Sequence, residues 1–145
     1  MISVLYVGNW LPLLDNTCRF LERKGDVTVE SSRSTGEALQ KMGHLSFDVV
    51  INDCDLEESA GIDLLRQIRQ KGVSTPFIFF TDGSCYGGER EAAQYGQVSF
   101  VPKLCHSGPG FGELENKIRS LVPVSHPGST NLQKDSICLV REEFP

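Results

Sequence analysis

The chain has 145 residues, a formal net charge of −5 and a hydrophobic fraction of 39%, which is the composition of a single soluble globular domain. This acidic balance leaves no basic footprint for nucleic acid, and no run approaches the roughly 18 apolar residues of a membrane span. The five cysteines are odd in number and form no C-x-x-C pair, so we expect free thiols in a reducing cytoplasm.

Short apolar runs alternate along the chain with amphipathic stripes. The runs predict five strands, at residues 2–7, 27–29, 49–51, 76–80 and 98–101. The stripes predict a helix after each strand, carried in turn by Leu13, Leu14, Cys18 and Leu21; by Ala38, Leu39 and Met42; by Ile62, Leu64, Leu65 and Ile68; by the sequence EREAAQY; and by Phe111, Leu114, Ile118 and Leu121. This alternation predicts an α/β fold, a parallel sheet covered by helices on both faces, with the flavodoxin-like strand order 2-1-3-4-5.

Turn and capping residues predict where some elements and the domain itself end. Ser34 or Thr35 is expected to cap the second helix, which then ends at Gly43. Residues 1–122 are predicted to form the domain, because the Pro, Gly and Ser content of the sequence after Val122 is typical of a linker or tail. Within this tail, residues 123–145, the apolar run 137–140 suggests either a stray strand or the beginning of a further element.

Polar side chains follow several of the predicted strands where each one ends. Asp53, Thr81 and Lys103 come at or after the ends of the third, fourth and fifth strands, and Gly8-Asn9 follows the first. These strand ends converge at the edge where open α/β sheets bind their ligands. A carboxylate there can attack phosphorus, the lysine can neutralise phosphoryl oxygens, and the hydroxyl can bond the acyl phosphate. Mg²⁺ is the ion expected in such a site.

The chain resembles the receiver domains of two-component response regulators from Ile2 to about Val122, and these strand-end residues carry the resemblance. The separations of 28 residues from Asp53 to Thr81 and 22 from Thr81 to Lys103 suit the family order. The resemblance implies roles for five residues: Asp53 as phosphoacceptor, Thr81 as switch hydroxyl, Lys103 as the conserved-type lysine, Phe100 as the rotating aromatic, and Gly61 as the glycine that opens the third helix.

The resemblance also implies a mechanism and partners. A histidine kinase or phosphotransfer protein would phosphorylate Asp53, and a partner-binding surface would then switch. A weakened Mg²⁺ site would consist of Asp53, Asn9 and the backbone carbonyl of Asp55. We expect no enzymatic activity of the chain's own, and a sensor or output domain is an expected partner beyond the tail.

The chain departs from the family pattern at several positions. Gly8-Asn9 stands where the family carries an acidic pair, and the loss of two formal charges should weaken Mg²⁺ binding. Asp82 replaces a small residue, Glu57 replaces the usual proline, and Pro102 precedes Lys103 instead of following it.

Three alternatives therefore stay open. The first is a pseudo-receiver, an interaction module that is not phosphorylated. The second is a phosphatase similar to haloacid dehalogenases, suggested by the D-x-D of Asp53 and Asp55, although Glu57 and the absence of an acidic pair after Lys103 speak against it. The third is purely structural, in which Asp53 caps a helix or forms a salt bridge with Lys103.

Overall fold

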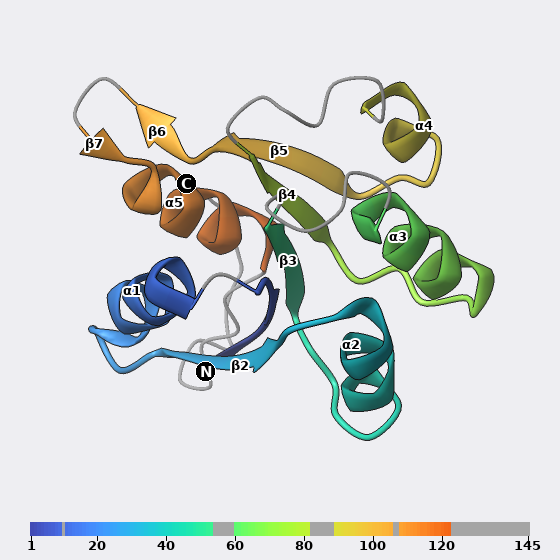
Figure 1. Cartoon of the computed structure of the whole chain (residues 1–145), viewed down its shortest axis with the longest axis horizontal. Coiled ribbons are helices and arrows are strands. Elements are labelled where there is room, and N and C mark those ends of the chain that lie inside the picture. Colours follow the sequence, from blue (N-terminus) through green and yellow to red (C-terminus); the bar gives the residue numbers. More distant parts are fainter. Residues whose placement is uncertain (10, 54–59, 82–88, 106–107, 123–145) are drawn as a thin grey trace, which may run out of the picture.

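The computed structural model describes residues 1–9, 11–53, 60–81, 89–105 and 108–122. Five strands form one sheet in which every neighbouring pair is parallel and the order is β2-β1-β3-β4-β5 (Figure 1). The strands are β1 (Ile2–Val7), β2 (Val27–Ser32), β3 (Val49–Asp53), β4 (Phe77–Thr81) and β5 (Val98–Pro102). The predicted flavodoxin-like fold is confirmed.

Helices cover both faces of this sheet (Figure 1). They are α1 (Leu11–Glu22), α2 (Thr35–Met42), α3 (Ala60–Gln70), α4 (Glu89–Ala93) and α5 (Phe111–Leu121). All five predicted helices are present. Helix α2 begins after Ser34, whose hydroxyl accepts a 3.1 Å hydrogen bond from the backbone N–H of Glu37, so Ser34 is the cap of the two predicted candidates.

Several details differ from the sequence prediction, and the observed ends of β3, β4 and β5 lie one or two residues beyond the predicted ones. Strand β2 extends to Ser32, three residues beyond the predicted end, because it pairs with β1 along its whole length. A short antiparallel pair, β6 (Leu104–Cys105) and β7 (Gly108–Pro109), lies between β5 and α5 and was not predicted. Strands of two residues are too short to show a period of alternating side chains.

The alternation of side chains along the strands divides the core into two layers. On one face, residues such as Tyr6, Ile51 and Phe80 pack under α1 and α5; on the other, residues such as Val50 and Phe79 pack under α2, α3 and α4. No helix among the described residues is long and apolar enough to cross a membrane. Residues 123–145 lie outside the described residues, so the domain boundary near Val122 stays a prediction.

Candidate functional site at the carboxyl edge of the sheet

Asp53 ends β3 and is 1% exposed, so its carboxylate depends on protein groups for partners. Its Oδ1 atom forms an ion pair with Nζ of Lys103, and its Oδ2 atom accepts a 2.8 Å hydrogen bond from the hydroxyl of Tyr6. Each carboxylate oxygen thus has a donor. The structure brings together Asp53 and Lys103, which the sequence placed at two different strand ends.

The backbone around Lys103 fixes where its side chain begins. Its N–H donates a 2.8 Å hydrogen bond to the carbonyl of Thr81, which joins the end of β5 to the end of β4. Its own carbonyl accepts a 2.6 Å hydrogen bond from Gly110. A Cβ on Gly110 would overlap the carbonyl oxygen of Pro102, so the close approach of these segments requires glycine. Hydrogen bonds at both the N–H and the carbonyl of Lys103 therefore fix the position of its backbone.

Tyr6 reaches Asp53 because residue 8 has no side chain. A Cβ built on Gly8 would lie 3.0 Å from both Cβ of Asp53 and Cε1 of Tyr6. Burial raises the pKa of Tyr6 far above its usual range, and the neighbouring charge of Asp53 raises it further. The phenol is thus a protonated donor to Asp53 at every physiological pH.

Thr81 and Phe100 lie toward the other face of the sheet, which α3 and α4 cover. The ring of Phe100 stacks on Phe79 with centroids 5.1 Å apart and planes 13° from parallel, and it is packed against the core of that face. Thr81 is two residues after Phe79 and is half-buried. The two residues that the resemblance names as switch positions therefore share a face, while Asp53 and Tyr6 lie toward the other.

Gly61 is placed where a side chain would collide with this face. A Cβ at residue 61 would lie 2.8 Å from the ring of Phe79 and still closer to the amide of Asn52. The first turn of α3 can approach β3 and β4 this closely only because residue 61 is glycine. The expected role of Gly61 thus has a packing reason here.

Two of the oxygen donors expected for a magnesium ion, Asp53 and Asn9, lie among the described residues. Asn9 is exposed after β1, while Asp55 and Asp82 lie outside the described residues. Among the described residues, no three His, Cys, Asp or Glu side chains are grouped to hold a metal. Asp53 and Asn9 are oxygen ligands of the kind that Mg²⁺ prefers, so they fit the ion in chemistry, with one negative charge between them. We therefore expect such a site to bind Mg²⁺ weakly.

The sequence analysis did not identify Tyr6 as part of this site. The signal was present: a phenol in an otherwise apolar buried strand needs a partner for its hydroxyl. Tyr6 pairs in register with Ile51, and Asp53 is the next residue of β3 on the same face. A tyrosine in a buried strand with a glycine two residues later therefore indicated that the phenol could reach a polar group on the neighbouring strand.

A parallel sheet of order 2-1-3-4-5 with an aspartate and a lysine at its carboxyl edge is the arrangement expected of a receiver-like fold. The sequence profile of the response regulator receiver domain matches residues 4–110. The chain therefore belongs to the response regulator receiver family. Receiver domains are in general signalling modules without catalysis of their own.

Individual proteins agree with the family assignment. The chain is 29% identical over 125 residues to a protein-glutamate methylesterase/protein-glutamine glutaminase of Nocardioides sp., covering 84% of this chain and 34% of that protein. Chemotaxis response regulator CheY4 of Vibrio cholerae superposes with a TM-score of 0.71 at 21% identity, over 84% of this chain and 99% of that one. Response regulator TrrA of Thermotoga maritima, solved in complex with Mg²⁺-BeF, gives a TM-score of 0.69 at 22% identity, over 84% and 100%.

The solved structures are similar in fold. Among the curated proteins, the chain spans only 34% and 22% of the length of the first two relatives it matches. The activities of the remaining parts of those proteins are therefore not assigned to this chain.

Proposed function

We propose that this chain is a phosphoacceptor receiver of a two-component phosphorelay, in which a histidine kinase or phosphotransfer protein phosphorylates Asp53 in the cytoplasm. The observation that carries the proposal is the ion pair between Asp53 and Lys103, formed by residues from two strands. It supports a site in which the lysine already lies beside the carboxylate that would bear the phosphoryl group, on the oxygen that Tyr6 does not contact.

The chemistry follows from the groups around Asp53. A carboxylate oxygen attacks phosphorus, and the bond from phosphorus to the donor's imidazole breaks. The ammonium of Lys103 then neutralises charge on the phosphoryl oxygens, and the hydroxyl of Thr81 donates a hydrogen bond to them. For Oδ2 to react, the hydroxyl of Tyr6 has to leave it. Asp53, Asn9 and the carbonyl of Asp55 would hold Mg²⁺, which supplies further positive charge.

The output would be a population shift between two packed states. Thr81 and Phe100 lie on the face that α3 and α4 cover, so a hydroxyl that moves toward the phosphoryl group changes the packing beside the stacked ring of Phe100. The surface of β4, α4, β5 and α5 is then the one that a partner reads. Such a partner is a separate protein or a sensor or output domain linked beyond residue 145.

The test is direct phosphorylation. The full chain is incubated with acetyl phosphate at millimolar Mg²⁺, and its intact mass is measured over time. We expect the addition of one phosphoryl group to the wild type and none to Asp53→Asn. If the wild type gains no phosphoryl group and binds no beryllium fluoride, the phosphoacceptor function is wrong.

A second candidate, a phosphate-independent interaction module, is favoured by the hydrogen bond from Tyr6 to Asp53. With Lys103 on one oxygen and Tyr6 on the other, the carboxylate is satisfied without metal or phosphate. In this case the contacts of Asp53 with Lys103 and Tyr6 stabilise the fold, and the domain presents a binding surface that does not switch. Failure of phosphorylation together with loss of stability in Asp53→Asn supports this candidate.

A further inference from the structure

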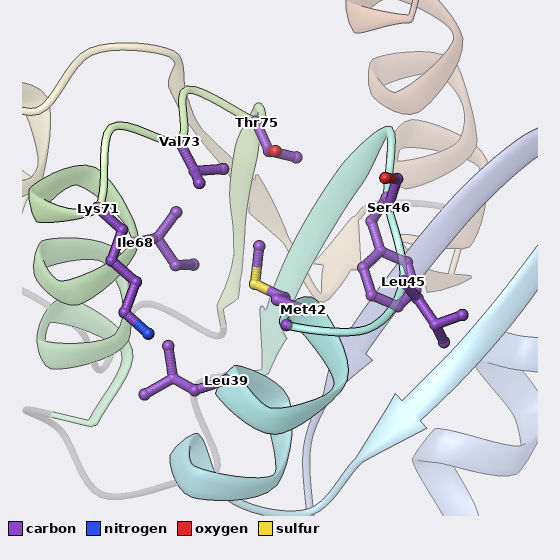
Figure 2. A pocket seen from close by; sticks show the side chains of 10 residues that line it. Leu39, Met42, Leu45, Ser46, Ile68, Lys71, Val73 and Thr75 are labelled. Carbon is purple, nitrogen blue, oxygen red and sulfur yellow. The ribbon is translucent and has the colours of Figure 1, made fainter.

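An apolar pocket lies at the amino-terminal edge of the sheet, opposite the edge that carries Asp53. It has a volume of about 340 Å³ and is formed by α2, α3 and the loops that follow them. Figure 2 shows Leu39 and Met42 of α2 across the space from Ile68 of α3 and from Val73. We call this cavity the α2–α3 pocket.

The pocket carries apolar side chains that water reaches. Leu45 is 50% exposed and Val73 is 37% exposed, and both line it. Apart from Met1, they are the exposed large hydrophobic residues among the part of the chain that the structure describes. Exposed apolar side chains that gather at one hollow, instead of being scattered singly, indicate a surface that another segment covers.

A second hollow lies next to this pocket and at the end of the described chain. Its volume is about 440 Å³, and Leu121 and Val122, at the end of α5, form part of its wall. Phe47 and Thr75 line both hollows. The segment that follows Val122 therefore starts at a depression that borders the α2–α3 pocket.

The sequence after Val122 contains one segment that suits the pocket. Residues 137–140, ICLV, are the one place in 123–145 where apolar residues follow each other. The fourteen residues 123–136 before them are rich in Pro, Gly and Ser. A flexible chain of this length has a root-mean-square span of about 20 Å and can extend to about 46 Å, which is ample for a neighbouring hollow.

Charge fits the same occupant. Lys71 lines the pocket, is exposed, and forms no ion pair with another described residue. Arg141 follows the apolar run and Glu142 and Glu143 come next, so these three residues carry a net charge of −1. We propose that residues 137–140 dock into the α2–α3 pocket of their own chain, with the two glutamates beside Lys71. The tail then covers the amino-terminal edge and leaves the edge that carries Asp53 free.

Cys138, inside the apolar run, allows a test on the unmodified full chain. Its alkylation rate by iodoacetamide is compared with that of a peptide of residues 131–145, and the labelled site is identified by peptide mass mapping. A segment docked nine-tenths of the time reacts about tenfold more slowly than the free peptide. Burial raises the pKa of Cys18 to about 11, so this thiol reacts slowly at neutral pH and interferes little.

Two variants locate the docking site. Val73→Asp puts a charge at the mouth of the pocket, and we expect Cys138 to react at the rate of the peptide. Arg33→Asp, an exposed change near the opposite edge, should leave the protection intact. As an independent measurement, Val73→Cys should form a disulfide with Cys138 under mild oxidation and Arg33→Cys should not, which decides the matter even if Val73→Asp does not fold.

Three results would overturn the proposal. The first is a Cys138 in the native chain that reacts as fast as in the peptide. The second is protection that survives Val73→Asp in a folded protein, because the segment then docks elsewhere. The third is protection or cross-linking that increases with protein concentration, because the occupant is then the tail of a second copy.

Discussion

The hydroxyl of Tyr6 donates a 2.8 Å hydrogen bond to Oδ2 of Asp53 inside the site. This contact is possible because residue 8 is glycine: a side chain there would press on both the tyrosine ring and the aspartate. Gly8 stands where the family pattern has a carboxylate, and the hydroxyl of Tyr6, a neutral hydrogen-bond donor, contacts Asp53 beside it. The contact therefore links the glycine at residue 8 to the hydrogen bonding of Asp53, the proposed phosphoacceptor.

Removal of the Tyr6 hydroxyl should leave Oδ2 of Asp53 without this hydrogen bond. For Tyr6→Phe we expect faster phosphorylation by acetyl phosphate, because Oδ2 no longer has to leave a hydrogen bond. We also expect a loss of about 1.5–3 kcal/mol in the free energy of unfolding, the range for hydrogen bonds to charged groups. Phosphorylation rates and urea unfolding measure the two effects.

Tyr95→Phe is the matched control for this change. The hydroxyl of Tyr95 lies 3.3 Å from Nε of Arg66 on α3, away from Asp53. Its removal should leave the phosphorylation rate unchanged. An equal rate in wild type and Tyr6→Phe would mean that the Tyr6 hydrogen bond does not limit the reaction.

The raised pKa of Tyr6 predicts a loss of stability at high pH. In the unfolded chain the phenol ionises near pH 10, whereas in the folded protein burial and the charge of Asp53 keep it protonated. The contribution of this group is complete below about pH 10 and is lost as the pH rises above that value. We expect the stability difference between wild type and Tyr6→Phe to shrink progressively in urea titrations as the pH rises above about 10. A constant difference would contradict the protonated, buried phenol.

A carboxylate at residue 9 should strengthen magnesium binding. Asn9 is exposed, so Asn9→Asp adds a negative charge without a packing cost. Because oxygen sites are tuned by the number of ligand charges, we expect affinity for Mg²⁺ to rise about tenfold. The fluorescence of Trp10, which follows residue 9 in the sequence, is the readout. No change in the titration would mean that residue 9 is not a ligand.

Gly61 and Gly36 form a matched pair for the close contact of α3 with the sheet. Gly61→Ala should lower the free energy of unfolding by about 1–3 kcal/mol, because its Cβ would meet Phe79 at 2.8 Å. Gly36→Ala in α2 should raise it by about 0.4–1 kcal/mol, because its Cβ would have nothing within 4 Å. Denaturation with urea measures both. If Gly61→Ala is as stable as the wild type, the contact with Phe79 is not a constraint.

Much of the site was predictable because parallel strands end at one edge. Asp53 and Lys103 were expected to meet there, and they do; Thr81 joins them through the backbone of Lys103. The partner of the second aspartate oxygen was not predicted, because an apolar run read as a buried strand does not say where the hydroxyl of Tyr6 goes. The β6–β7 pair was missed for a different reason: strands of two residues are too short to show a period of alternating side chains.

The most direct test of the central proposal is the intact mass of the wild-type chain after incubation with acetyl phosphate at millimolar Mg²⁺, with Asp53→Asn measured in parallel. The account predicts the addition of a single phosphoryl group that disappears in Asp53→Asn. The account would be contradicted if both the wild-type chain and the Tyr6→Phe variant stayed unmodified at every Mg²⁺ concentration.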